Sequence, residues 1–183
     1  EIEVVVVDDG STDRTGELAR RAGATVIRHE RNRGVGAAFR TGLAVSSERG
    51  ADILVTIDAD GQFDPATIEQ LIQPIQAGEA DFVTASRFVN SAMTPAMPWS
   101  KKIGNHLIAR WVSAMVKTRY RDVSCGFRAY GRNAFLRLVL LGDFTYTHEV
   151  FLNLAFAGVP IKEVPMPVRG TREHGRSRVA GNL

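Results

Sequence analysis

Short runs of apolar, mostly β-branched residues alternate with helical segments along the first half of the chain. The runs cover residues 2–7, 25–28, 53–57 and 81–85, and short connections join them to the intervening helices. Because the longer runs are continuously apolar rather than alternating, they predict strands that are buried on both faces. Strands and helices in this order predict an α/β fold with three layers around a mostly parallel central sheet.

The chain has 183 residues, a length that suits one domain. Its charges are divided unevenly. Residues 1–90 carry 9 basic and 15 acidic side chains, whereas residues 91–183 carry 14 basic and 5 acidic ones. The net charge of +3 therefore combines an acidic first part with a basic second part. The basic part predicts an anionic partner, such as a phosphate or a membrane surface; the alternative is a solvated basic face without a partner.

Composition excludes several classes of protein. A single cysteine leaves no internal disulfide framework and fits a reducing compartment. The chain has no apolar run long enough to span a bilayer. It also lacks the zinc-finger spacings and interleaved aromatic residues of nucleic-acid readers, so no nucleic acid is expected as a partner.

Two carboxylates directly follow the apolar run at residues 53–57. Asp58 and Asp60 are two positions apart, so both side chains project to the same side of an extended chain. Ligands of open α/β sheets bind at the carboxyl ends of the strands, where this pair offers oxygen ligands to Mg²⁺ or Mn²⁺. The alternative is a solvated turn in which an aspartate caps the following helix.

A second acidic turn, DDGS at residues 8–11, follows the first apolar run. Both acidic turns are therefore expected at one edge of the sheet, where carboxylates suit the hydroxyl and amide groups of a nucleoside. The segment NRGVGAAFRTG at residues 32–42 contains Gly34 and resembles a helix start that binds an anion. Close packing of this helix on the sheet explains the glycines equally well.

Six segments, taken in order, resemble a family 2 glycosyltransferase: DDGSTD, NRGVGAAFRTG, DADGQFDP, ASRF, DVSCGFRAY and EVPMPVRGTREHGRSR. The similarity covers nearly the whole chain and points to the branch of dolichyl-phosphate mannose synthases and bacterial polyprenyl-phosphate sugar transferases. It implies a Rossmann-like GT-A fold that forms one domain over residues 1–183. Residues 1–90 would bind the nucleotide sugar and residues 91–183 the acceptor. The resemblance also implies a strand ahead of residues 2–7, so the chain is expected to lack the family's first strand.

The resemblance assigns roles to individual residues. The metal, Mg²⁺ or Mn²⁺, is assigned to Asp58, Asp60 and Gln62. The nucleotide is assigned to Asp8, Asp9, Ser11, Gly34 and Asp58. The acceptor phosphate is assigned to Arg87, Lys101, Lys102, Arg172, Ser177 and Arg178. The expected catalytic residues are Asp60, Arg87, Asp122 and Arg172. Asp122 takes the position of a catalytic carboxylate in transferases with alcohol acceptors, and here it either accepts a proton or positions other groups.

A helix predicted at residues 101–118 carries a stripe of apolar side chains. The stripe consists of Ile103, Leu107, Ile108, Trp111, Val112, Met115 and Val116. Basic residues surround it, and this combination suits a helix that lies in a membrane interface. A helix that packs its stripe against the protein core is the alternative.

The predicted reaction is the transfer of mannose or glucose from GDP-mannose or UDP-glucose to a polyprenyl phosphate, on the cytoplasmic face of a membrane. A phosphomonoester has a second pKa of about 6, so its oxygen is already a nucleophile at neutral pH. One displacement by that oxygen inverts the anomeric carbon. The alternatives are a glycosyltransferase with an alcohol acceptor, a metal-dependent phosphohydrolase and a non-catalytic membrane-binding module.

Overall fold

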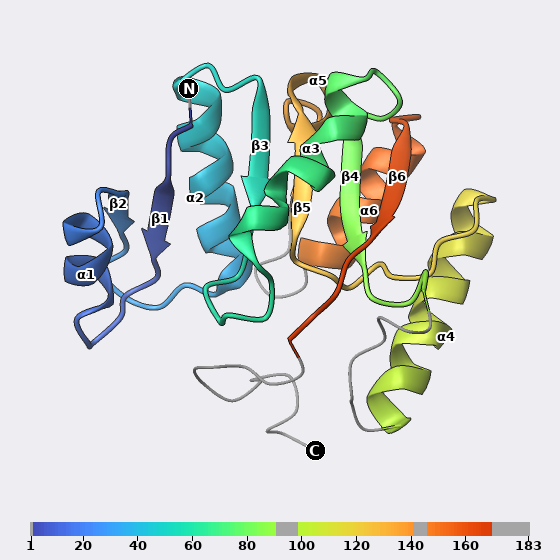
Figure 1. Cartoon of the computed structure of the whole chain (residues 1–183), viewed down its shortest axis with the longest axis horizontal. Coiled ribbons are helices and arrows are strands. Elements are labelled where there is room, and N and C mark those ends of the chain that lie inside the picture. The colour runs from blue at the N-terminus through green and yellow to red at the C-terminus, as the bar shows by residue number, and fades with distance from the viewer. Residues whose placement is uncertain (1, 91–98, 141–145, 170–183) are drawn as a thin grey trace.

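The fold is described from a computed structural model that places residues 2–90, 99–140 and 146–169, with the side chain of Lys101 left out. Strands form a central layer and helices cover both of its faces (Figure 1). The predicted three-layer α/β architecture is therefore confirmed. In chain order the elements are β1 (Val5–Asp8), α1 (Thr15–Arg21), β2 (Thr25–Arg28), α2 (Val35–Glu48), β3 (Ile53–Thr56), η1 (Pro65–Thr67), α3 (Ile68–Gln76), β4 (Phe82–Ser86), α4 (Trp99–Val116), β5 (Arg128–Gly131), α5 (Arg132–Phe135), α6 (Tyr146–Phe156) and β6 (Ile161–Pro165).

The strands form two hydrogen-bonded groups. One is a four-stranded sheet in the order β3-β5-β4-β6, and the other is the parallel pair β1-β2. Strand β4 is parallel to β6, whereas β5 is antiparallel to both of its neighbours. Among the described strands, all except β5 therefore point the same way (Figure 1), which confirms the mostly parallel arrangement. No described strand joins β1 to β3.

Two apolar clusters pack against opposite faces of the four-stranded sheet. The first joins β4 and β5 to α2, α4 and α6 through side chains such as Phe39, Val112 and Phe151. The second joins the sheet to α3 through Leu71 and Phe127. Every residue of β4 and β5 is buried, whereas most residues of β1, β2 and β3 are only partly buried. The prediction of strands buried on both faces is therefore confirmed for β4 and wrong for β1 and β3. The core therefore lies under the middle of the four-stranded sheet.

The apolar sequence of residues 133–141 favours a helix over that whole range, and this expectation is wrong beyond the first turn. Helix α5 ends at Phe135, and the side-chain amide of Asn153 in α6 donates to the carbonyl of Val139 at 3.1 Å. The guanidinium of Arg137 donates to the carbonyl of Ala157 at 3.4 Å. Backbone hydrogen bonds of the helical kind continue only to Leu138, and the contacts with α6 and the residue after it hold the segment beyond α5.

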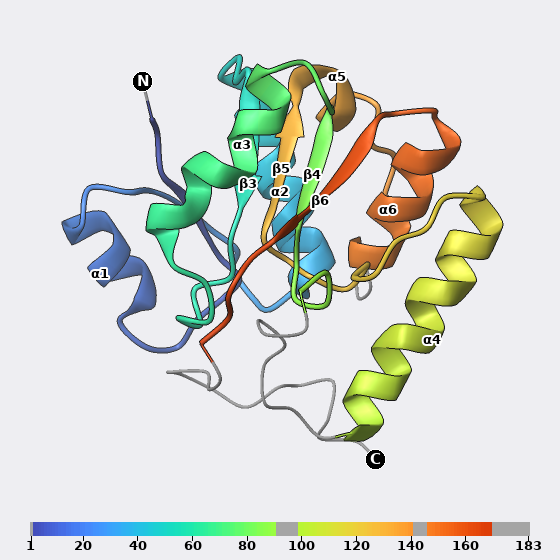
Figure 2. The same cartoon turned by 45° about the vertical axis from the view of Figure 1, so that its right-hand side comes forward.

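Helix α4 begins at Trp99 and ends at Val116, close to the predicted bounds. Lys117 then has φ of 54°, a left-handed conformation that a helix cannot continue through. Figure 2 shows α4 running along one side of the molecule with much of its length away from the sheet. Within the described residues, no helix is long and apolar enough to cross a membrane.

Candidate active site

The Asp58–Asp60 pair lies directly after β3, as predicted. Asp58 is exposed and Asp60 is partly exposed, with its Oδ1 accepting a hydrogen bond from the amide of Gln62 at 3.1 Å. The loop that leads into β5 passes close to Asp58. A Cβ atom at Gly126 would lie 2.8 Å from Asp58 Oδ2, so a larger residue here would require the Asp58 side chain to move.

The pair has the donor chemistry that a hard divalent cation requires. Carboxylate oxygens at a strand end suit Mg²⁺ or Mn²⁺, which keep several coordination positions for water and substrate phosphates. The described residues contain no group of three or more His, Cys, Asp or Glu side chains able to hold a metal. Asp58 and Asp60, with Gln62 beside them, therefore suit a cation that completes its coordination with substrate.

Asp122 and Arg87 form a buried ion pair at the same edge. Arg87 Nε lies 2.7 Å from Asp122 Oδ2, and Arg87 Nη2 lies 2.9 Å from Oδ1. The amides of Arg87 and Ser124 also donate to this carboxylate, at 3.1 and 3.2 Å. The Asp122 side chain is fully buried, and that of Arg87 is 19% exposed. Burial lowers the pKa of Arg87, but the contact with Asp122 outweighs it and raises that pKa above its ordinary value.

Glu163 in β6 supports this pair, although the sequence assigned it no role. Its carboxylate accepts hydrogen bonds from the amides of Arg121 and Asp122 at 2.8–3.0 Å. Burial raises the pKa of Glu163, while those amide hydrogen bonds oppose the rise. The residue lies in the quoted segment EVPMPV, but only the pairing of β6 with β4 brings it beside Asp122.

Asp8 and Ser11 hold the first acidic turn together. Asp8 Oδ1 accepts a hydrogen bond from the Ser11 amide at 2.8 Å, and Oδ2 lies 3.7 Å from Arg28 Nε. Hydrogen bonding from Ser11 lowers the pKa of Asp8. The side chain of Asp8 is fully buried. It therefore shapes the turn, and a nucleoside would meet Ser11 or Asp9 first.

Asp9 links the ends of β1 and β2 to the start of α2. Its Oδ1 lies 2.7 Å from Nδ1 of His29 and accepts the Arg33 amide at 2.9 Å. Its Oδ2 accepts the amide of Gly34 at 2.9 Å. Burial raises the pKa of Asp9, but these hydrogen bonds outweigh it and lower the pKa. The Gly34 amide, expected to help bind an anion, is therefore already bound to Asp9.

His29 is a second residue that sequence reasoning missed. It is buried, and its Nε2 lies 2.9 Å from the hydroxyl of Thr41 in α2. A cavity of about 370 Å³ beside it is lined by Arg28, His29, Glu30, Arg31 and Arg33. Three arginines next to Asp9 make this edge of the turn suitable for an anionic group.

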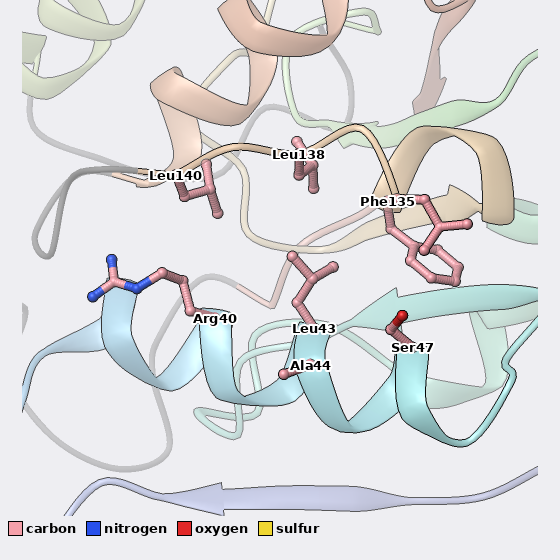
Figure 3. Close-up of a pocket in the computed structure, with 8 residues that line it drawn as sticks. Arg40, Leu43, Ala44, Ser47, Phe135, Leu138 and Leu140 are labelled. Atoms are coloured by element: carbon pink, nitrogen blue, oxygen red, sulfur yellow. The ribbon is translucent and has the colours of Figure 1, made fainter.

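A second cavity lies against α2. It measures about 370 Å³ and is lined mainly by apolar side chains between α2 and the segment after α5, including Leu43, Phe135 and Leu140 (Figure 3). Arg40 and Ser47 are its polar residues. None of the acidic residues described above lines it, so this cavity is separate from the candidate active site.

The remaining expected residues cannot be placed at the site. Arg172, Ser177 and Arg178 lie outside the described residues, as does the side chain of Lys101. Lys102 is exposed on the first turn of α4. In Figures 1 and 2 strands β1, β3 and β4 end at the same edge of the strand layer, where α2 begins. The fold thus brings Asp9, Asp58, Asp60 and Arg87 to a common edge.

The sequence profile described as Glycosyl transferase family 2 matches residues 1–139. The chain belongs to this family. It is 31% identical over 193 residues to the undecaprenyl-phosphate mannosyltransferase of Micrococcus luteus, covering 100% of this chain and 78% of the relative. It is 34% identical over 173 residues to the dolichyl-phosphate hexose transferase of Haloferax volcanii, covering 91% and 70%.

Solved structures show the same fold. Glucosyl-3-phosphoglycerate synthase of Mycobacterium tuberculosis, solved with Mn²⁺, UDP-glucose and phosphoglyceric acid, has a TM-score of 0.68 and 25% identity to this chain. The similarity covers 93% of this chain and 61% of that one, so the chain spans less than two thirds of the solved protein. The GT-A fold expected from the motifs is therefore confirmed.

Proposed function

We propose that this family 2 glycosyltransferase moves a hexose from a nucleotide sugar to the phosphate of a polyprenyl phosphate. The named relatives act on undecaprenyl or dolichyl phosphate, and the chain covers most of their length. Asp58 and Asp60 would hold the divalent metal, with GDP-mannose or UDP-glucose as the donor. Residues 1–90 would serve the nucleotide sugar and residues 91–183 the acceptor, within one domain over residues 1–183.

The state of Asp122 is the observation that favours a phosphate acceptor. Its carboxylate receives four hydrogen-bond donors, two from the guanidinium of Arg87 and two from backbone amides. A carboxylate offers about four acceptor positions, so all are occupied. An alcohol acceptor needs a base to remove its proton, and a saturated, buried carboxylate is poorly suited to that role. A phosphate dianion needs no base.

Arg87 keeps donors for the acceptor phosphate. A guanidinium carries five N–H donors. In Arg87, the donor on Nε and one donor on Nη2 bond to Asp122. The remaining donors can bind a phosphate oxygen, and Asp122 fixes the plane in which they lie. Lys101, Lys102, Arg172, Ser177 and Arg178 would complete the acceptor site.

The reaction is one inverting displacement. A phosphate oxygen of the acceptor forms a bond to the anomeric carbon while the bond from that carbon to the donor diphosphate breaks. The electron pair leaves with the nucleoside diphosphate, and no proton moves. A bound divalent metal would stabilise the negative charge of the diphosphate. Asp9 and Ser11 hold the nucleoside, and Arg87 orients the attacking phosphate.

Helix α4 suits attachment to an anionic membrane surface, on the cytoplasmic face where nucleotide sugars occur. Most of its apolar stripe is exposed, including Ile103 at 48%, Leu107 at 61% and Trp111 at 59%. Only the inner side, with Ala109 and Val112, packs into the core. The helix contains basic residues and no aspartate or glutamate. Each basic residue near an anionic surface adds about 1 kcal/mol of attraction.

The proposal is tested by metal-dependent donor binding. In calorimetric titrations with GDP-mannose and UDP-glucose, wild type should bind one of them in the presence of Mn²⁺ or Mg²⁺. Asp60→Ala should abolish that binding because it removes an oxygen ligand of the metal. The control Asp52→Ala, at an exposed carboxylate before β3, should bind as wild type does. Donor binding that ignores both the metal and Asp60 would contradict the proposal.

The acceptor is tested by transfer. Purified protein should transfer the hexose to a polyprenyl phosphate, and Arg87→Ala and Arg172→Ala should remove transfer while donor binding persists. Loss of donor binding in these variants would assign the arginines to the diphosphate instead. Transfer to an alcohol but not to a phosphate would identify the alternative glycosyltransferase. Release of phosphate from a phosphomonoester without a sugar donor would identify a phosphohydrolase.

A further inference from the structure

Ser124 and His148 meet beside the Arg87–Asp122 ion pair. Ser124 lies in the loop that leads from α4 to β5, and His148 lies in the first turn of α6. His148 Nε2 is 3.1 Å from Ser124 Oγ, and both side chains are partly exposed. The amide of Ser124 donates to Asp122, and Gly126, two residues on, packs against Asp58. Ser124 therefore lies between the ion pair and the acidic pair.

The imidazole determines where the Ser124 hydroxyl proton points. Burial and the nearby Arg128 lower the pKa of His148, while Asp122 opposes the shift, so the ring is neutral at neutral pH. A neutral ring carries one N–H. If that proton is on Nε2, the ring donates to Ser124 Oγ, and the hydroxyl proton is directed to another acceptor.

The charge around this pair favours an anionic acceptor. The guanidinium of Arg128 is fully buried and donates to the carbonyls of Val123 and Thr147 at 2.9 Å. These carbonyls belong to the residues directly before Ser124 and His148. Arg87 balances the charge of the neighbouring Asp122. A hydroxyl held beside a buried cation interacts best with an oxygen that carries negative charge.

We infer that Ser124 is a further contact to the acceptor phosphate and that His148 is its positioning residue. This inference rests on the proposed function, because it needs a phosphate acceptor at this edge. In binding, Ser124 Oγ–H donates to a phosphate oxygen while His148 Nε2–H donates to Ser124 Oγ. Neither residue gains or loses a proton in the reaction.

The test combines direct binding with kinetics. Binding of a short-chain isoprenyl phosphate is measured by calorimetry, without donor, for wild type and four variants. Ser124→Ala and His148→Leu should each weaken binding about tenfold, the loss expected for a hydrogen bond to a charged group. Ser124→Thr and His148→Gln keep a hydroxyl and an N–H donor, so they should stay close to wild type. In transfer assays the acceptor KM should rise in the two disruptive variants while kcat changes little.

A double-variant cycle tests the positioning role. If His148 acts only through Ser124, the combined Ser124→Ala/His148→Leu variant should bind no more weakly than Ser124→Ala alone. Additive losses would overturn the positioning role of His148. Ser47→Ala, at a serine in α2 that is far from Ser124 in the sequence, is the control. Thermal unfolding verifies that every variant is folded.

The outcomes separate this inference from the proposed function. If Ser124→Ala binds the isoprenyl phosphate as wild type does, the inference is wrong even where transfer is observed. If Ser124→Ala instead weakens donor binding with Mn²⁺, Ser124 contacts the donor and the inference is again wrong. If wild type binds the isoprenyl phosphate through Ser124 but transfers no sugar to it, the proposed function fails while the phosphate contact stands. Absence of any isoprenyl phosphate binding by wild type overturns the inference.

Discussion

The charges of Asp122 and Arg87 are stabilised mainly by their contact with each other rather than by solvent. The carboxylate is fully buried, and the guanidinium is 19% exposed. Burying two charges is costly, and their close contact offsets that cost only while both are present. The pair can therefore be tested separately from any activity.

Asp122→Ala should destabilise the protein by about 3 kcal/mol, because the variant leaves the Arg87 charge largely buried without its partner. Urea unfolding followed by circular dichroism measures the change. The double variant Arg87→Met/Asp122→Leu, which removes both charges, should be closer to wild type. Equal losses in the single and double variants would show that packing, rather than charge, holds this region.

Asp9 predicts a dependence of stability on acid. Its pKa is lowered in the folded protein, so the unfolded chain binds its proton at a higher pH. The stabilisation is complete above the ordinary carboxyl value of 3.8 and is lost as pH falls through the folded value. Asp9→Asn should therefore lose stability at pH 7 and depend less on pH in the acid range.

The free energy of unfolding, measured from pH 7 to pH 2, tests this expectation. Asp52→Asn, at an exposed carboxylate outside the Asp9–His29–Thr41 contacts, is the control and should follow wild type. If the free energy of unfolding of Asp9→Asn depends on pH as that of wild type does, the hydrogen bonds of Asp9 contribute little to stability.

At the scale of elements, α4 presents two different faces. Leu107 is 61% exposed, whereas Val112, five residues later, is fully buried. The stripe expected from the sequence therefore divides between solvent and core. Its inner side packs against the core, and its exposed outer side is the one that the proposed membrane contact would use. Substitutions on the two sides should have separate effects.

Leu107→Glu should abolish sedimentation with vesicles that contain anionic lipid and change the free energy of unfolding by less than about 0.5 kcal/mol. Val112→Ala should do the reverse, with a loss of stability of about 2 kcal/mol from the cavity it leaves. Vesicles of neutral lipid at the same salt concentration are the control. Persistent binding of Leu107→Glu to anionic vesicles would exclude this face of α4 as the membrane contact.

At the scale of the whole molecule, the two strand groups differ in their protection from solvent. All residues of β4 and β5 are buried, and both strands are paired on two sides. Strands β1 and β2 are mostly half-buried and pair only with each other among the described strands. Local opening therefore costs less free energy in the β1-β2 pair.

Hydrogen exchange measured by mass spectrometry should show faster exchange in residues 5–8 and 25–28 than in residues 82–86 and 128–131. A metal with a nucleotide sugar should slow exchange in the first group, because Asp9 and Ser11 lie at its end. Uniform exchange across both groups would show that the molecule opens only as one unit.

Local patterns in the sequence predicted most elements and the acidic turns. Continuous β-branched runs identify strands, although not how deeply each strand is buried, since β4 is buried while β1 and β3 are only partly so. The spacing of Asp58 and Asp60 depends only on the neighbouring backbone. The end of the helix after Phe135 was not predictable in this way, since it depends on hydrogen bonds to α6.

The sequence by itself determined the layered α/β class, the family and the carboxylates that suit a metal. The tertiary structure decided which of the expected residues are exposed and which are paired. It placed Asp122 against Arg87, Asp9 against His29 and Ser124 against His148, over separations of 35, 20 and 24 residues. Such pairs depend on how strands and helices pack, because nothing in the local spacing of the chain brings these residues together.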